Sequence, residues 1–190
     1  MQITRNTRKM LTVTLALIVA TLVGGCGAAG PDHNAADVTF AQQMIPHHAQ
    51  AVEMAKDAPA KAQSAQVKQL AAAIEAAQQP EIDQMTAMLT RWNAPVPKAD
   101  DDMAGMDHGS MNHGSMPGMM SDQQMDQLES ATGAQYDREF LTMMIGHHQG
   151  AVDMSATELR DGSDAEAKAL AQKITDAQRT EIAQMQAMLR

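Results

Sequence analysis

The chain of 190 residues contains one sequence unit twice, 100 residues apart. FAQQMIPHHAQAVEM (40–54) returns as FLTMMIGHHQGAVDM (140–154), with 8 of 15 positions identical. LAAAIEAAQQPEIDQMTAML (70–89) returns as LAQKITDAQRTEIAQMQAML (170–189), with 12 of 20 identical. Because the offset is the same in both blocks, a single duplication explains both matches. The chain must therefore fold as two similar halves, and each half carries a His-His pair.

Each copy predicts a helical hairpin. Apolar residues recur at helical spacing in four long segments, and strand signals are absent. The expected long helices cover about 37–56, 61–92, 134–159 and 164–189. Ser121 and Gln124 form a capping box that predicts a further short helix. Each hairpin has an apolar face that needs a partner, so the sequence predicts an all-α four-helix bundle with pseudo-twofold symmetry, built from repeats at 36–93 and 121–190.

Two details of these helices are expected to shape the core. Pro46 and Pro80 fall inside predicted helices, where proline removes a hydrogen bond and usually kinks the axis. Gly146, the counterpart of Pro46, is also a weak helix former, so both copies loosen the helix just before His-His. The predicted buried stripe of the second helix comprises Leu70, Ala73, Ile74, Ala77, Met85 and Met88.

The first 25 residues have the features of a bacterial export signal. Arg5, Arg8 and Lys9 precede an apolar run of about 14 residues, which is too short to span a bilayer. The sequence Val-Gly-Gly before Cys26 resembles a lipobox, in which Cys26 becomes the acylated first residue of the mature protein. A plain cleaved signal and an uncleaved anchor are the alternatives. Residues 26–35 are then a flexible tether between the lipid and the domain.

Charge and composition narrow the partners. Cys26 is the only cysteine, so no internal disulfide can form. The mature chain would keep 11 basic and 23 acidic residues, a net charge of −12. Such an acidic protein is poorly suited to binding nucleic acid, because phosphate contacts require basic side chains. Its attachment to a membrane would depend on the lipid anchor.

The paired histidines are the strongest candidate metal ligands. On a helix, His47 and His48 straddle one face, with a methionine one turn before and another two turns beyond. Imidazole binds copper, zinc, nickel or iron, and thioether sulfur favours Cu(I). The predicted bundle ligands are Met44, His47, His48, Met54, Met144, His147, His148 and Met154. Core-filling methionines and hydrogen-bonded core histidines are the structural alternative.

Glu81 and Glu181 occupy matching positions on the second helix of each hairpin. A carboxylate inside a bundle needs a partner, so each is expected to orient a histidine by hydrogen bonding or to ligate directly. A carboxylate at the solvent-facing rim is the alternative.

The segment 94–120 between the hairpins is rich in Pro, Gly, Asp, Met and His and has no helical period. It is predicted to be a disordered linker, or one that orders only around a ligand. HGSM occurs twice in it, flanked by further methionines, which favours soft-metal binding over low-complexity filler. The predicted linker ligands are Met103, Met106, His108, Met111, His113, Met116, Met119 and Met120.

The two blocks resemble the bacterial domain of unknown function 305 family. The resemblance lies in the paired F-x3-M-[IV]-x-H-H-x2-A-V-[ED]-M motifs, each followed by A-Q-x2-E-I-x-Q-M-x-x-M-L, and it covers about residues 36–190. It implies a ferritin-like four-helix fold, an exported location and, for some members, periplasmic copper binding linked to copper tolerance. By motif position, it also places the ligands on the His-His pairs and the methionines of the first motif.

The leading hypothesis is a lipid-anchored copper protein on the extracytoplasmic side of the cell membrane. It would buffer or sequester Cu(I), with Cu(II) also possible, and silver should bind similarly because it is soft. One alternative is a ferritin-like metal oxidase, but the chain has no Glu-x-x-His motif of di-iron centres. A metal-free structural or partner-binding bundle is the other alternative.

Overall fold

The computed structural model describes residues 32–97 and 116–190. Over these residues the protein is all-helical, with one isolated β-bridge between Ala62 and Gly133. The all-α four-helix fold is therefore confirmed. The proposed signal peptide, Cys26 and the middle of the predicted linker lie outside the described residues. The helices are α1 (Ala35–Lys56), α2 (Ala58–Lys61), α3 (Ala65–Arg91), α5 (Asp122–Ser130), α6 (Gly133–Asp161) and α7 (Ala165–Met188).

Polar side chains set the start of most helices. Asn34 and Asp37 form a capping box at α1, and Ser121 and Gln124 form the predicted capping box at α5. The side chains of Ser64 and Asp164 accept backbone N–H groups at the starts of α3 and α7 in the same way. Such caps satisfy N–H groups that have no partner within the helix.

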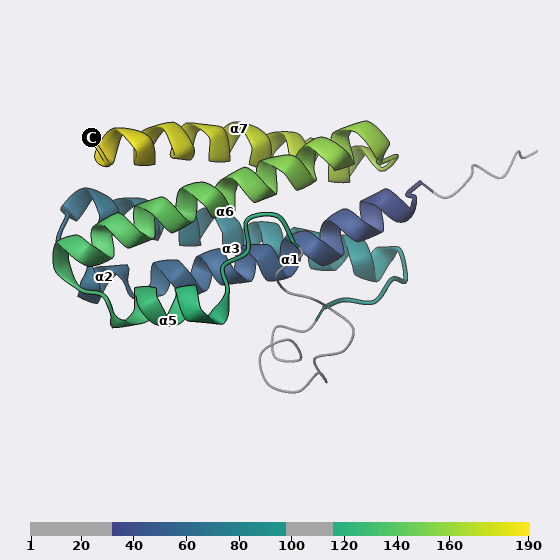
Figure 1. Ribbon diagram of the computed structural model, residues 1–190. Helices are drawn as coiled ribbons and strands as arrows, with labels where there is room; N and C mark the ends of the chain where they lie inside the picture. The colour runs from purple at the N-terminus through teal and green to yellow at the C-terminus, as the bar shows by residue number, and fades with distance from the viewer. Residues whose placement is uncertain (1–31, 98–115) are drawn as a thin grey trace, which may run out of the picture. The chain divides into compact units, whose positions relative to one another are not determined.

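The two hairpins meet through the helices that carry the histidines. In Figure 1, α1 lies beside α3 and α6 lies beside α7, and α1 also packs against α6. Contacts between α3 and α7 are few by comparison. The interface between the two copies is thus formed mainly by α1 and α6, which places both His-His segments at the centre of the bundle.

The buried stripe of α3 differs in part from the predicted one. Ala73 and Ala77 are exposed, whereas Ala71 and Gln78 are buried. Buried positions alternate in steps of four and three, as in helices that pack along one another. Alanine is too small to indicate which face of a helix is buried. The predicted stripe was therefore misplaced where alanines dominate. The predicted Leu70, Ile74, Met85 and Met88 are buried, and the observed buried residues are Val67, Leu70, Ala71, Ile74, Gln78, Glu81, Met85, Met88 and Leu89.

Two apolar clusters fill the core, and each takes methionines from both copies. One contains Met54, Met144 and Met185, together with Tyr136 and Phe140. The Tyr136 hydroxyl donates to the backbone carbonyl of Met54 at 2.9 Å. The other cluster contains Met44, Met85, Met88 and Met154. The pseudo-twofold relation between the hairpins therefore extends to the methionines.

Candidate metal centre

All four histidines of the two pairs are fully buried, at 0% exposure. The rings of His47 and His147 lie with their centroids 3.7 Å apart and their planes at 33°. Within each pair the centroids are 6.5 Å (His47–His48) and 6.4 Å (His147–His148) apart. Both His-His pairs therefore point into the bundle, and the structure brings them together at one centre.

Two hydrogen bonds, one buried and one part-buried, connect this centre to the second helix of each hairpin. His48 Nε2 donates to Glu81 Oε2 at 2.8 Å, and His148 Nε2 donates to Glu181 Oε2 at 2.7 Å. Glu81 is only 4% exposed, so the rim alternative is wrong for this residue; Glu181 is half-buried. A carboxylate only accepts, so each Nε2 carries the proton and each Nδ1 of a neutral ring keeps its lone pair.

Five ring nitrogens of the four histidines have no hydrogen-bond partner. They are Nδ1 of His47, His48, His147 and His148, and Nε2 of His147. Buried polar atoms are nearly always paired, because leaving one unpaired costs about 1–3 kcal/mol. So many unpaired nitrogens in one place favour a ligand-binding centre over a set of satisfied core histidines.

Burial keeps the imidazoles of His47, His48 and His147 neutral. It lowers the pKa of His47 to about 3, and it lowers the pKa of His48 although Glu81 opposes the change. Burial and the neighbouring His47 hold the pKa of His147 well below its ordinary value. Burial alone would raise the pKa of Glu81, but the hydrogen bond from His48 and the cation of Lys173 hold that pKa below its ordinary value. Neutral imidazoles beside an ionised carboxylate form a suitable ligand set for a cation.

The predicted methionine ligands flank the histidines. Met44 and Met144 are completely buried one turn before the pairs, and Met54 and Met154 are 1% and 7% exposed. Met85 and Met185 belong to the same two clusters. In residues 32–97 and 116–190, no three His, Cys, Asp or Glu side chains are grouped closely enough to hold an ion by themselves. The buried methionines offer thioether sulfur, a ligand that suits a soft ion.

Part of the predicted linker lies directly against the centre. We term Met116–Ser121 the strap; in Figure 1 it is the green segment before α5 that passes across α1 and α6. Its Pro117 carbonyl accepts a hydrogen bond from His47 Nε2 at 3.2 Å. The linker ligands Met116, Met119 and Met120 belong to the strap and are half-buried. The remaining predicted linker ligands, Met103, Met106, His108, Met111 and His113, lie outside the described residues.

Sequence reasoning missed several polar residues near the predicted glutamates. Gln78 and Gln178 are buried one turn before Glu81 and Glu181, and each has at least one side-chain atom without a partner. The signal was available, because both glutamines recur at the same position of the repeat. Lys173 Nζ lies 3.2 Å from Glu81 Oε1, a cross-repeat contact that no sequence pattern indicates.

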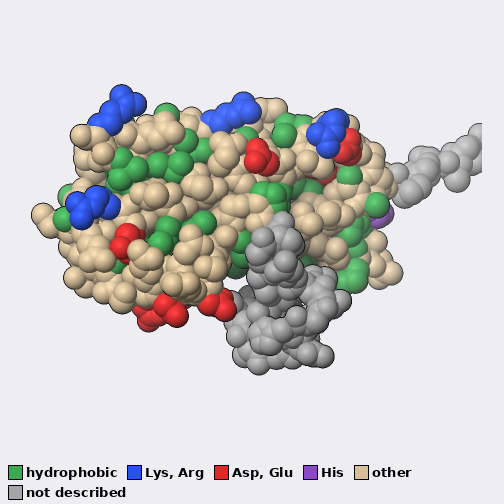
Figure 2. Space-filling model, in the orientation of Figure 1, with side chains coloured by type: hydrophobic (Ala, Val, Ile, Leu, Met, Phe, Trp, Pro, Cys, Tyr) green, Lys and Arg blue, Asp and Glu red, His purple; other side chains and the backbone are tan. Residues whose placement is uncertain are grey.

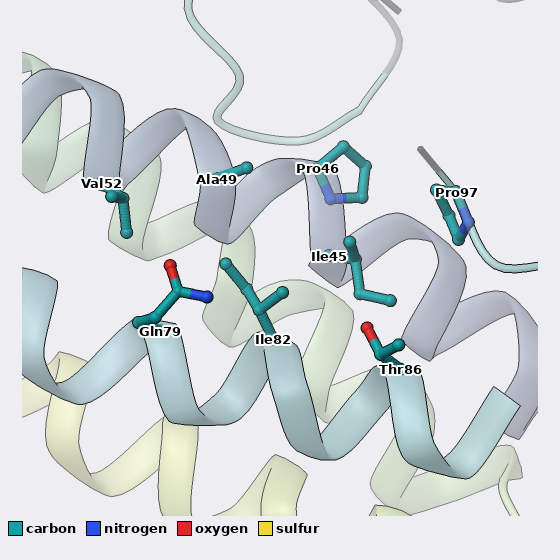
Figure 3. Close-up of a pocket in the computed structure, with 8 residues that line it drawn as sticks. All are labelled: Ile45, Pro46, Ala49, Val52, Gln79, Ile82, Thr86 and Pro97. Carbon is teal, nitrogen blue, oxygen red and sulfur yellow. The ribbon is translucent and has the colours of Figure 1, made fainter. Parts of the chain in front are cut away.

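Other surfaces offer weaker candidates. Figure 3 shows an apolar groove between α1 and α3, where Ile45 on α1 extends toward Ile82 and Thr86 on α3. None of the predicted ligands lines this groove. On the face shown in Figure 2, Lys and Arg side chains are scattered singly, which is unlike a phosphate-binding surface. No helix in the described part of the chain has the length and hydropathy needed to cross a membrane.

Fold and centre together define a duplicated helical-hairpin protein with a buried histidine–carboxylate cluster. The chain belongs to the family named domain of unknown function (DUF305), whose profile matches residues 37–189. No curated protein matches the sequence.

Three solved structures are similar over nearly their whole length. A DUF305 fragment from Deinococcus radiodurans is 34% identical with a TM-score of 0.71, covering 84% of this chain and 98% of its own. A DUF305 protein from Streptomyces coelicolor is 32% identical with a TM-score of 0.70, covering 81% and 91%. CopM in the Cu(II)-bound form is 36% identical with a TM-score of 0.66, covering 80% and 94%. CopM has also been solved in Cu(I)-bound and Ag-bound forms.

Proposed function

We propose that this protein is an exported, lipid-anchored copper-binding protein that buffers or sequesters Cu(I) and Cu(II) and thereby supports copper tolerance. The observation that carries the proposal is the set of five unpaired ring nitrogens in a buried four-histidine centre. Similarity to CopM, which has been solved with Cu(II), Cu(I) and Ag, supports copper as the ion. Silver would bind for the same reason of softness.

In this proposal each residue class has its own role. The ligands are drawn from the four histidines and the flanking Met44, Met54, Met144 and Met154, while Glu81 and Glu181 orient His48 and His148. With Nε2 held by a carboxylate, His48 and His148 would bind through Nδ1. The centre is proposed to bind rather than to catalyse, because no nucleophile or di-iron ligand motif accompanies it in the sequence. The linker methionines and histidines would form a second, weaker class of copper sites.

The proposed location of the protein depends on Cys26. Acylation of Cys26 would tether the bundle to the extracytoplasmic face of the cell membrane. Thioether and imidazole ligands suit an oxidising compartment in which thiolates would not persist. Mass spectrometry of the mature protein tests this part, and an unmodified Cys26 or cleavage at another residue would overturn it.

Metal titration tests the binding proposal. A Cys26→Ser chain without its signal, which lacks the lipid and the only thiol, would be titrated with Cu(I), Ag(I), Cu(II) and Zn(II) against competing chelators. Replacing His47, His48, His147 and His148 by Gln should remove the tightest Cu(I) and Ag(I) class, whereas deletion of 103–115 should lower only the stoichiometry of the weaker class. The double variant His48→Gln, His148→Gln is the fallback should the quadruple variant lose its helicity. Unchanged tight binding in these histidine variants would make the histidines structural.

A further inference from the structure

The strap is fitted to the bundle at three independent points. Gln50 on α1 holds it by two hydrogen bonds, because its Nε2 donates to the Met120 carbonyl at 2.9 Å and its Oε1 accepts from the Met120 N–H at 2.7 Å. Gly150 on α6 leaves room for it, since a Cβ there would overlap the Pro117 carbonyl. Gly118 adopts φ of +79°, and a Cβ on it would crowd the carbonyl oxygens of Gly146 and His147. A segment resting loosely on the surface would not show such matching.

This fit breaks the symmetry of the duplication at one repeat position. Gln50 and Gly150 are counterparts, yet Gln50 binds the strap and Gly150 makes space for it. One strap serves the whole centre, so only one copy receives its carbonyl. His47 Nε2 donates to Pro117, whereas His147 has no hydrogen bond of good geometry on either ring nitrogen.

The chemical consequence is a fixed tautomer for His47. A carbonyl only accepts, so neutral His47 must carry its proton on Nε2 and direct its lone pair to Nδ1. The Pro117 carbonyl thus does for His47 what Glu81 does for His48. Hydrogen bonds of this kind orient metal-binding histidines, and their loss typically weakens metal affinity about 10–100-fold. In the second copy only His148 is oriented in this way.

We propose that the strap is a positioning element for His47, held by Gln50 and admitted by Gly150, which makes the first-copy histidine pair the tighter of two unequal half-sites for soft metal ions. That a soft metal ion binds here rests on the proposed function, whereas the orientation of His47 rests on the hydrogen bonds alone. His47 and His48 are both pre-oriented, so they lose less conformational freedom on binding an ion than His147 and His148.

Two matched pairs of substitutions test the proposal. Gly150→Ala should displace the strap, whereas Gly146→Ala, one turn earlier on α6, meets nothing within 4 Å. Gln50→Ala removes the bonds to Met120, whereas Gln42→Ala removes a similar bond from α1 to the Pro95 carbonyl at 2.8 Å. Within each pair the change of side chain is the same, but only one member has its side-chain position against the strap. Gln50→Ala also serves as the milder variant if Gly150→Ala perturbs the fold.

The first measurement needs no metal. Long-range ¹⁵N–¹H NMR of the metal-free protein reports the protonated nitrogen of each histidine, and wild-type His47 is expected to be protonated on Nε2. Gly150→Ala and Gln50→Ala should shift His47 towards a mixture of tautomers, with the controls unchanged. The proposal is overturned if His47 keeps the same tautomer in all five proteins, or if the wild-type ring is protonated on Nδ1.

The second measurement uses Ag(I), an air-stable soft ion. The dissociation constant of the tightest class should rise about 10-fold in Gly150→Ala and Gln50→Ala at unchanged stoichiometry, and by less than about twofold in the controls. Equal affinities across the set, with the tautomer changed, would show that orientation by the strap does not govern binding. If wild type bound no Ag(I) tightly, the proposed function would fail instead, and the tautomer result would still decide whether the strap positions His47.

Discussion

The two copies of the repeat carry the same candidate metal ligands in different surroundings. Both copies present a buried His-His pair, and the second histidine of each pair donates to a glutamate 33 residues later. The groups around them differ: Glu81 also pairs with Lys173, whereas the repeat counterpart of Lys173 is Ala73. Of the four histidine rings, only that of His47 donates a hydrogen bond to the strap. Duplication thus supplied the chemistry twice, while single substitutions made the two halves unequal.

A similar contrast occurs where an aspartate of each copy caps the start of a helix in the other copy. Asp37 accepts the N–H groups of Ser163 and Asp164 before α7, and Asp137 accepts those of Gln63 and Ser64 before α3. These reciprocal bonds connect the hairpins at both ends of the interface. Asp37 is fully buried and lies beside the buried Glu158, whereas Asp137 is half-buried and the counterpart of Glu158 is Ala58.

The largest expected effect is the loss of stability when each of these two capping aspartates is replaced. Asp37→Ala leaves the buried N–H of Asp164 and the part-buried N–H of Ser163 without acceptors and should lower the free energy of unfolding by about 3 kcal/mol. Asp137→Ala leaves groups that water can reach and should cost about 1 kcal/mol. Urea denaturation of both variants measures the difference. Equal losses would show that burial does not distinguish the two ends.

Glu158 should make the stability of the protein depend on pH through one end of the bundle and not through the other. Burial and the neighbouring Asp37 raise the pKa of Glu158 from 4.5 to about 8. Between these values the folded protein holds a proton that the unfolded chain has lost, so the stability that is fully present below pH 4.5 declines as pH rises towards 8. Glu158→Gln should flatten this decline and be more stable than wild type at pH 8.5 by on the order of 2 kcal/mol.

Thermal unfolding between pH 4 and 9 measures the Glu158 effect. Glu75→Gln, an exposed position on α3, is the matched control and should follow the wild-type curve. A Glu158→Gln curve parallel to wild type across the window would mean that Glu158 is ionised in the folded protein.

Removing the orienting carboxylates should test how unequal the half-sites are. Glu81→Gln and Glu181→Gln should each weaken Ag(I) binding about 10-fold, but in different classes, with Glu81 affecting the tighter one. Lys173→Met should change only the tighter class, by at most about threefold, because the lysine side chain is 65% exposed. Competition titration resolves the classes. A single class in every variant would show that the four histidines act as one symmetric site.

The smallest expected effect concerns the two glycines of α6. Gly146→Ala should raise stability by up to about 1 kcal/mol, because alanine is the better helix former and the site is open. Gly150→Ala should show no such gain, since its methyl group would overlap Pro117. Melting temperatures of the two variants provide the comparison, and an equal rise in both would indicate that the strap moves away without resistance.

Periodicity and duplication in the sequence were sufficient to predict the helices, the four-helix arrangement and the placing of the histidines on a face shared with apolar residues. Those properties depend on local spacing and on apolar faces that need a partner, and both are written along the chain. The glutamates were also predictable as partners, because they recur at the same repeat position on an inward-facing stripe. Alanine-rich stretches were the exception, and there the buried face was misplaced at Ala73 and Ala77.

Only the tertiary structure decided how the two copies differ. The contact of Lys173 with Glu81, the approach of Asp37 to Glu158, and the position of the strap between Gln50 and Gly150 all join residues distant in sequence. No periodic pattern encodes such contacts, because they depend on the angle and register at which α1 crosses α6. The sequence by itself predicted the ligands of the candidate centre, and the packing of the two hairpins determined which of its histidines are held by a hydrogen bond and which are not.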